Sequence, residues 1–512
     1  MANKDLLVGI DCGTQGLRTV VVNTDGDILG EASREFPINY PRPAWAEQNP
    51  EDWWQAARET VKEAVAQARA TGDDVAGLSV DGTSCTVVAC KRDGTPLRPA
   101  ILWMDQRAHE EAAAITATEH SCLKYVSWQE SPEWMIPKAW WLSKHEPEVF
   151  ADADLVIEEV DWLMHKLTGR WTASLNNVTC KWNYARPEGG WPVGLLEEIG
   201  FAELVEKWPE EVLAMGAPAG ELTAQAAEEL GLQAGTPVAE GGIDAYAGML
   251  GVGVVKPGRL ALVMGTSTCH MALCDRGLFE SHVWGPYPDA LIEGTWILEG
   301  GQTATGAIVD WLADNFGWRE EQEAEKAGRN RFEVLDEKAA AVSPGAEGLV
   351  VLDYWQGNRT PIRDPLARGV ILGLSLSHGI GHVLRAIYEG TAMGTRHILA
   401  DLAQAGFELE GIYACGGGTR SELWLQIHAD VCQTPLYTTA VPEATALGTA
   451  LCAAVGAGLF EDMAGAAERM VKVTRTIEPD PDKAEVYDFY FDKYLRTYPA
   501  LKDIMHEIAG RN

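Results

Sequence analysis

A single carboxylate stands at the start of a run of small and apolar residues near the middle of the chain. Asp244 follows two glycines and opens the segment Ala245 to Val254, in which Gly and Ala are frequent. A helix N-terminus favours the ionised form of such a residue, which suits it to act as a general base. Asp is also a preferred N-cap, so a purely structural cap is the alternative. The segment alone leaves both roles open.

Three glycine-containing turns follow predicted strands and could bind phosphate. They are Gly13-Thr14-Gln15, Gly265-Thr266-Ser267 and Gly416-Gly417-Gly418-Thr419. Backbone N–H groups at such turns can converge on an anion, and the hydroxyls add donors. Each turn by itself is more simply a structural turn, but the three together favour a phosphate cradle. The chain has neither a P-loop motif nor a GxGxxG that opens a helix near the N-terminus, so a nucleotide would bind in another way.

Continuous apolar runs predict the strands that position these turns. Strands are expected at 6–10 and 17–22 around the first turn, at 259–264 and 268–273 around the second, and at 412–415 before the third. Further strands are expected at 28–32, 75–80 and 87–90, with helices from Pro50 to about Arg69 and from about residues 421, 444 and 483. Both halves place Gly-Thr at a hairpin tip, which indicates an internal duplication. His270, inside an apolar strand, is expected to be a hydrogen-bonded core histidine.

Length and charge bound the classes of protein that are possible. A chain of 512 residues is too long for one ordinary core, and we expect two domains, 1–253 and 254–512. The net charge of −34 disfavours nucleic acid and anionic membranes as partners. Ten scattered cysteines without a CxxC pair are typical of free thiols in a reduced, cytoplasmic setting. The apolar stretch from Ala446 to Phe460 is short for a membrane span and predicts a buried helix.

The motifs together resemble those of the FGGY family of carbohydrate kinases. The resemblance covers essentially the whole chain, and within the family it is nearest to ribulokinases. The family motifs are 9–15, 45–50, 241–245, 265–267, 299–302, 357–361 and 415–418, and the narrower match rests on 81–87, 131–138, 178–182 and 265–271.

This resemblance implies an α/β fold of two RNase H-like domains, of the actin/hexokinase ATPase type, with sugar and ATP meeting in the cleft between them. Asp244 would be the catalytic base, and Asp11 would hold Mg²⁺ through water. The sugar contacts would come from Thr83, Ser84, Cys85, Trp103, Asp105, Lys181, Asp244, Glu299 and Gln302. The ATP contacts would come from Gly13, Thr14, Gln15, Gly265, Thr266, Ser267, Gly306, Gly416, Gly417, Gly418 and Thr419.

Two positions depart from the pattern of many relatives: Tyr246 stands where they carry His, and Ser421 where they carry Asn. The implied reaction is ATP-dependent phosphorylation of a ketopentose, with L- or D-ribulose as the leading substrate. Xylulose, ribitol, and erythrulose or erythritol are the alternative substrates. A non-catalytic sensor of sugar or nucleotide on the same fold is the alternative from another class. The implied partners are small molecules, and a homodimer is compatible with the family.

Overall fold

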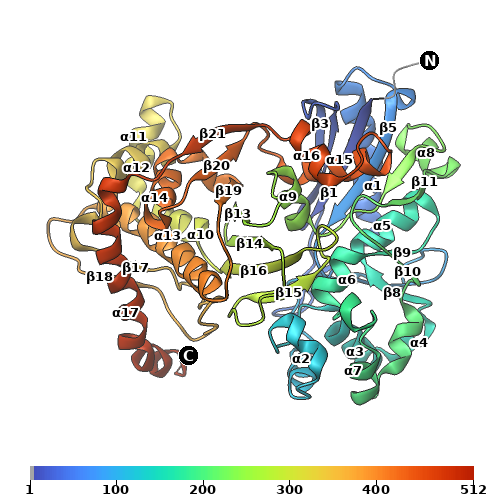
Figure 1. Ribbon diagram of the computed structural model, residues 1–512, viewed down its shortest axis with the longest axis horizontal. Coiled ribbons are helices and arrows are strands. Elements are labelled where there is room, and N and C mark those ends of the chain that lie inside the picture. Colours follow the sequence, from blue (N-terminus) through green and yellow to red (C-terminus); the bar gives the residue numbers. More distant parts are fainter. Residues whose placement is uncertain (1–4, 512) are drawn as a thin grey trace.

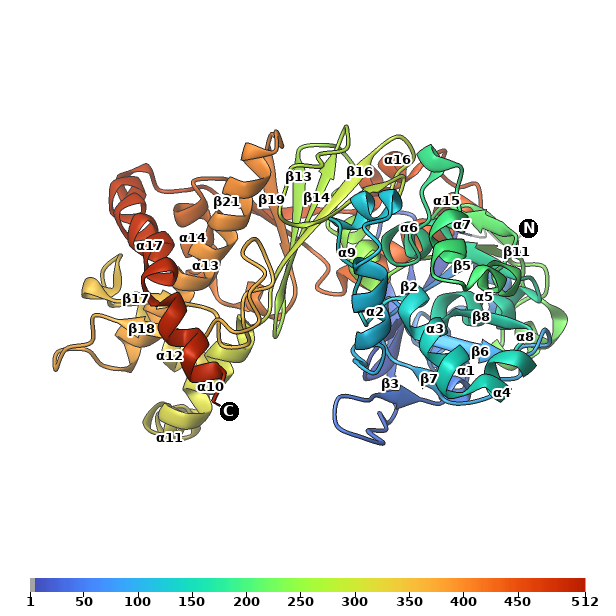
Figure 2. The ribbon, with the colours of Figure 1, turned by 90° about the horizontal axis from the view of Figure 1, so that it is seen from below.

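The chain forms two lobes, each built on a mixed sheet with helices packed on it (Figure 1). The computed structural model describes residues 5–511. The main sheet of the N-terminal lobe has six strands in the order β11-β12-β5-β1-β2-β3. That of the C-terminal lobe has seven, in the order β15-β16-β14-β13-β19-β20-β21. The predicted α/β class is confirmed, and Figure 2 shows the two lobes from a second direction.

The strands of the first sheet are β1 (Leu6–Gly13), β2 (Gly16–Val22), β3 (Ile28–Glu35), β5 (Val75–Gly82), β11 (Pro218–Glu221) and β12 (Pro237–Ala239). Those of the second are β13 (Arg259–Met264), β14 (Thr268–Cys274), β15 (Trp284–Pro288), β16 (Trp296–Gln302), β19 (Gly411–Cys415), β20 (Leu436–Thr439) and β21 (Val473–Ile477). Smaller sheets contain β4 (Glu47–Gln48), β6 (Val87–Cys90), β7 (Ala100–Ile101), β8 (Leu155–Glu158), β9 (Thr172–Ser174), β10 (Glu211–Leu213), β17 (Val350–Leu352) and β18 (Val370–Leu372).

The helices of the first half are α1 (Pro50–Gln67), α2 (His109–Thr116), α3 (Met135–His145), α4 (Pro147–Asp152), α5 (Glu159–Thr168), α6 (Leu175–Lys181), α7 (Val193–Glu198), α8 (Ala224–Leu230) and α9 (Asp244–Gly251). Those of the second half are α10 (Gly306–Phe316), α11 (Trp318–Ala327), α12 (Arg331–Ala340), α13 (Ile380–Gln404), α14 (Glu422–Cys432), α15 (Ala444–Gly456), α16 (Met463–Met470) and α17 (Ala484–Ala509). The helix predicted from Pro50 begins there, with the Asn49 side chain accepting from the N–H of Glu51.

The two main sheets repeat one topology. In the first, β1, β2 and β3 form an antiparallel meander, while β5 and β12 run parallel to β1, and β11 closes the edge antiparallel. In the second, β13, β14 and β16 form the meander, β19 and β20 run parallel to β13, and β21 closes the edge antiparallel. This correspondence confirms the internal duplication that the two Gly-Thr hairpins predicted.

A helix from the second half of the sequence returns to the first lobe. Helix α15 packs on β1 and β5 and crosses α9, as Figure 1 shows by the red-orange helix beside the blue strands. The two backbones touch, because a Cβ on Gly251 would lie 1.8 Å from the Ala444 carbonyl, and one on Gly448 would lie 1.8 Å from the Ala247 carbonyl. Small residues at these positions therefore let α15, from the second half of the chain, pack closely against α9 of the first lobe.

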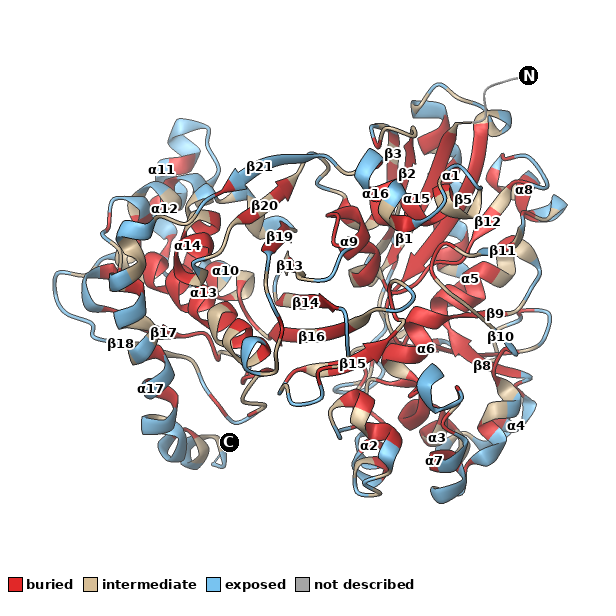
Figure 3. Ribbon diagram, viewed as in Figure 1, coloured by how far each residue is buried: buried red, intermediate tan, exposed pale blue. Residues whose placement is uncertain are grey.

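The buried residues lie in the sheets and in the helix faces against them, and the exposed ones lie on outer helices such as α11 and α17 (Figure 3). His270 is fully buried and its Nε2 lies 2.9 Å from the Thr395 hydroxyl, which confirms the predicted core histidine. All ten cysteines are free thiols. Among helices within residues 5–511, none combines the length and apolarity needed to cross a bilayer.

Candidate active site

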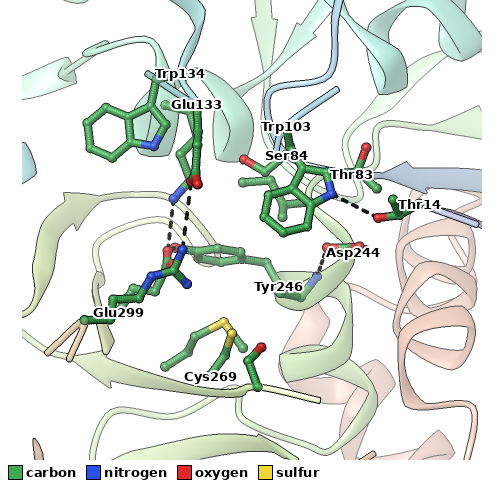
Figure 4. Close-up of a pocket in the computed structure, with 16 residues that line it drawn as sticks. Thr14, Thr83, Ser84, Trp103, Glu133, Trp134, Asp244, Tyr246, Cys269 and Glu299 are labelled. Carbon is green, nitrogen blue, oxygen red and sulfur yellow. Dashed lines mark hydrogen bonds and ion pairs between the residues drawn. The ribbon is translucent and has the colours of Figure 1, made fainter. Parts of the chain in front are cut away.

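A cavity of about 260 Å³ lies between the two lobes (Figure 4). The first half of the chain lines it with Thr14, Thr83, Ser84, Trp103, Glu133, Trp134, Lys181, Ile243, Asp244, Ala245 and Tyr246. The second half lines it with Ser267, Cys269, Met271, Glu299 and Arg359. The structure thus brings together the predicted catalytic acid, five other predicted sugar contacts, and one hydroxyl from each Gly-Thr turn.

Asp244 is the first residue of α9, and Ile243 is the residue in the N-cap position. Its Oδ1 accepts from the N–H of Ala245 at 2.6 Å, and the carboxylate faces the cavity (Figure 4). Burial raises the pKa of Asp244 to about 7, and the nearby charge of Asp11 contributes to this rise. A carboxylate that titrates near neutral pH is well matched to general-base chemistry.

An ion pair between the two lobes lines the cavity. Lys181 of α6 places its Nζ 3.2 Å from Oε2 of Glu299, which lies on β16 in the other lobe. The hydroxyl of Tyr246 donates to the same oxygen at 3.2 Å. Although burial opposes the charge on both groups, the pair raises the pKa of Lys181 and lowers that of Glu299. Both therefore stay charged and can orient hydroxyl groups of a ligand.

The segment after β5 supplies neutral donors and acceptors. The Thr83 hydroxyl donates a hydrogen bond to Glu159 Oε2 at 2.5 Å and lies 2.6 Å from Thr86 Oγ1. Its hydrogen-bonding capacity is therefore already used within the protein. Ser84 Oγ, by contrast, is buried and has no hydrogen-bond partner within residues 5–511. A buried hydroxyl without a partner is costly, and a ligand hydroxyl in the cavity would satisfy it.

The first Gly-Thr turn reaches the cavity through one residue. The Thr14 hydroxyl accepts from Trp103 Nε1 at 2.9 Å, which joins this turn to the wall that the Trp103 ring forms. Gly13 and Gln15 flank Thr14, and Gln15 is exposed. The turn thus presents its hydroxyl, and not the Gln15 side chain, to the space near Asp244.

Two further carboxylates, Asp11 and Asp81, lie near Asp244. Burial raises the pKa of Asp11 to about 6 and raises that of Asp81 well above its usual value, and the charge of Asp11 adds to the rise at Asp81. Asp81 also accepts from the Thr449 hydroxyl of α15. Within residues 5–511, no group of three or more His, Cys, Asp or Glu side chains is arranged to hold a metal by itself. Magnesium at phosphates is commonly held by one or two carboxylates, water and phosphate oxygens, and Asp11 fits that pattern.

A second cavity, of about 580 Å³, adjoins the other side of the Gly265–Ser267 turn. Its lining consists of Gly265, Thr266, Gly306, Val309, Asp310, Asn330, Phe332, Glu333, Asp336, Tyr388, Gly417, Gly418, Arg420, Ser421 and Trp424. Gly417 meets no other atoms where a Cβ would stand, so this backbone is open to a ligand. Aromatic and amide side chains beside an open glycine backbone suit a nucleoside.

Several predicted contacts lie outside both linings. Cys85 and Gln302 are buried, and Gln302 donates to Asp353 at 2.7 Å and to the Thr391 carbonyl at 2.9 Å. Asp105 is fully buried in an ion pair with Arg107, 2.7 Å away, and accepts from the N–H of Ala46. The others in this group are Gly13, Gln15, Gly416 and Thr419, which are adjacent in sequence to lining residues, and Asp11, whose charge acts on the lining residue Asp244.

The structure also adds residues that the roles assigned from the sequence did not include. Glu133 and Arg359 line the first cavity from opposite lobes, with Arg359 Nη2 3.9 Å from Glu133 Oε2. Trp134, Tyr246 and Cys269 complete its walls. Glu133, Trp134 and Arg359 fall within the motifs 131–138 and 357–361, so the sequence marked these segments as part of the site. It did not show which side chains of the segments face the cavity.

The fold and the two adjoining cavities define a two-domain kinase architecture of the actin/hexokinase type. The FGGY N-terminal domain of carbohydrate kinases matches residues 6–251, and the FGGY C-terminal domain matches residues 260–457. The chain belongs to the FGGY family of carbohydrate kinases.

Individual relatives agree with this assignment. A Xenopus laevis FGGY carbohydrate kinase domain-containing protein is 34% identical, with 98% of each chain covered. A Shouchella clausii ribulokinase is 33% identical, covering 99% of this chain and 96% of the relative. The crystal structure of a Rhodospirillum rubrum xylulose kinase superposes with a TM-score of 0.85 at 30% identity, covering 98% of this chain and 100% of the other.

Proposed function

We propose that this carbohydrate kinase transfers the γ-phosphate of ATP to a ketopentose, with ribulose as the preferred sugar. The observation that carries the proposal is the shared Gly265–Ser267 turn: Ser267 faces the cavity of Asp244, and Gly265 and Thr266 face the second cavity. A sugar in the first cavity and ATP in the second would therefore meet at this turn. Residues 1–253 would supply most of the sugar contacts, with Glu299 added from the second half, and residues 254–512 would supply most of the ATP contacts.

In this mechanism, Asp244 accepts the proton of the sugar hydroxyl as that oxygen attacks the γ-phosphorus. The bond from the γ-phosphorus to the bridging oxygen breaks, ADP leaves, and the proton on the Asp244 carboxyl passes to solvent. Phosphoryl transfer depends mainly on positioning and charge neutralisation. Lys181, Glu299 and Ser84 would orient the sugar hydroxyls, and Thr14 and Ser267 would donate to phosphate oxygens.

Magnesium would neutralise phosphate charge when bound. Asp11 would hold it through water, and the two carboxylates of Asp11 and Asp244, close enough for the charge of one to act on the other, would favour a cation here. The Gly416–Thr419 turn would bring backbone to the adenosine, with Gly417 and Gly418 in contact and Gly416 and Thr419 shaping the turn.

The ribulose preference is supported by ribulokinase relatives at 31–33% identity over nearly the whole chain. Xylulose is the second candidate, because the Rhodospirillum rubrum xylulose kinase shares 30% identity and the fold. The two sugars differ in the configuration of one hydroxyl carbon, which changes the contacts available to Lys181, Glu299 and Ser84.

The test is ADP release from Mg-ATP with a panel of D- and L-ribulose, D- and L-xylulose, ribitol, erythrulose and erythritol. We expect the largest kcat/KM with one of the ribuloses. A larger value with xylulose, a polyol or a tetrulose would overturn the ribulose assignment. Saturable binding of sugar or ATP without any sugar-dependent ADP release would instead indicate a non-catalytic sensor.

A further inference from the structure

A buried lysine lies behind the wall of the sugar cavity. Lys138 of α3 is fully buried, and its Nζ donates to the carbonyls of Cys85 and Leu102, each at 2.7 Å, and approaches that of Trp103 at 3.4 Å. An ammonium group has three donors, so three backbone carbonyls can use its full capacity. No carboxylate within residues 5–511 forms an ion pair with Lys138 at 4.0 Å or less.

The three carbonyls belong to two separate segments that line the cavity. The segment after β5 carries Thr83 and Ser84, and the segment after β7 carries Trp103. Lys138 itself does not line the cavity. It therefore joins, from the rear, two stretches of chain whose front sides face the space beside Asp244.

Buried carboxylates hold the first segment from its other side. Glu158 accepts from the N–H of Cys85 at 2.7 Å, and Glu159 accepts from the N–H of Thr83 at 3.0 Å. The Cys85 N–H thus donates to Glu158, and the Cys85 carbonyl accepts from Lys138. Its φ of 57° lies in the left-handed region, which costs a non-glycine residue about 1–2 kcal/mol per residue. Hydrogen bonds to both the N–H and the carbonyl of this residue give its conformation specific support.

The conformation of the segment decides where Ser84 points. Ser84 Oγ is buried at the cavity and has no hydrogen-bond partner in the part of the chain that the structure describes. A displaced Cys85 carbonyl would move the preceding residue with it. The position of the Ser84 hydroxyl thus depends on Lys138 and Glu158, neither of which lines the cavity.

We propose that Lys138 is a positioning residue for the sugar: by holding the 83–85 and 102–103 segments together, it sets the Ser84 hydroxyl and the Trp103 ring against the substrate. This inference rests on the proposed function and adds a residue to it. Removal of the ammonium group should weaken the binding of sugar, because the cost of ordering the two segments would then fall on the binding step.

The variants are Lys138→Met, which keeps the length and loses the donors, and Lys138→Arg, which keeps a cation with N–H donors. Lys144→Met is the matched control, since Lys144 lies on the same helix, has a side chain that is 43% exposed, and does not line the cavity. We expect Lys138→Met to raise the KM for sugar at least about tenfold while the KM for ATP changes less than about twofold. Lys138→Arg should recover most of the loss, and Lys144→Met should match the wild type.

A double variant separates positioning from general weakening of the fold. In the Ser84→Ala background, Lys138→Met should raise the sugar KM by less than it does in the wild type, because the group it positions is gone. Equal effects in both backgrounds, or a rise in both KM values together, would overturn the proposal. If Lys138→Met does not fold, Lys138→Gln, which keeps an amide donor, takes its place in the same comparison.

Amide hydrogen exchange tests the positioning role of Lys138 without depending on enzyme turnover. Lys138→Met should accelerate exchange in the peptides covering 83–86 and 102–105, with α9 unchanged, and unchanged exchange in both peptides would overturn the proposal. A wild-type protein that phosphorylates no sugar would refute the proposed function and leave this readout intact. A wild type that turns over sugar normally, with an unaltered sugar KM in Lys138→Met, would refute only the role of Lys138.

Discussion

The ion pair between Lys181 and Glu299 offers a quantitative test of the sugar cavity. The two groups come from different lobes, lie 3.2 Å apart, and have side chains only 11% and 17% exposed. Breaking one partner of a buried pair costs about 3–5 kcal/mol, because a charge is left uncompensated. Since both groups border a cavity that admits water, we expect Glu299→Gln to lose about 2–3 kcal/mol, or roughly 30- to 150-fold in kcat/KM for sugar.

The assay is steady-state ADP release by Glu299→Gln, Lys181→Met and the double variant. If the pair acts as one unit, the double variant loses much less than the product of the two single losses. Glu293→Gln is the matched control, because its pair with Arg186 is exposed and should be worth no more than about 1 kcal/mol. Multiplicative losses in the double variant, or a control that loses as much as Glu299→Gln, would refute the reasoning.

Three further predictions follow from single sites. The kcat/KM for sugar should decrease as the pH is lowered through about 7, the pKa of Asp244, because Asp244 must be ionised to accept a proton. A flat pH profile from pH 5 to 8 would contradict this. Gly416→Ala should raise the KM for ATP at least about tenfold and spare that for sugar, because φ is +90° and the new Cβ would lie 2.5 Å from the Met264 carbonyl. Glu130→Gln should raise thermal stability at alkaline pH. Burial raises the pKa of Glu130 from 4.5 to about 8, so the folded state is most stable below pH 4.5, where Glu130 is protonated in both states, and it loses stability as the pH rises through 8. A gain of about 2 kcal/mol at pH 8 that vanishes near pH 4 is expected, and an equal gain at both pH values would contradict it.

The parts of the fold that depend on local sequence patterns could be predicted from the sequence. Apolar runs and Gly-Thr tips predicted the two meanders, and the structure places them as corresponding strands of two sheets. The crossing of α15 onto the first lobe could not be predicted in this way. It depends on the contact between Gly448 and the Ala247 carbonyl, which joins residues about two hundred positions apart in the sequence.

The candidate site divides in the same way. Asp244, Lys181 and Glu299 were predicted through motifs, and the structure brings them to one cavity. Asp105 was predicted there too, but it lies outside the lining because the nearby Arg107 holds it within the protein. Arg359 was not assigned a role, since only the packing of the two lobes shows which side of its loop faces the cavity.

Replacement of the proposed base tests the central claim most directly. Asp244→Asn keeps the size of the side chain and removes its ability to accept a proton, so sugar-dependent ADP release should fall at least about a hundredfold. ATP affinity, measured by calorimetry on the same preparation, should stay within about threefold of the wild type, because Asp244 lines the sugar cavity and not the adenosine cavity. Loss of turnover with retained ATP binding is the predicted result. Turnover within about tenfold of the wild type would contradict the account.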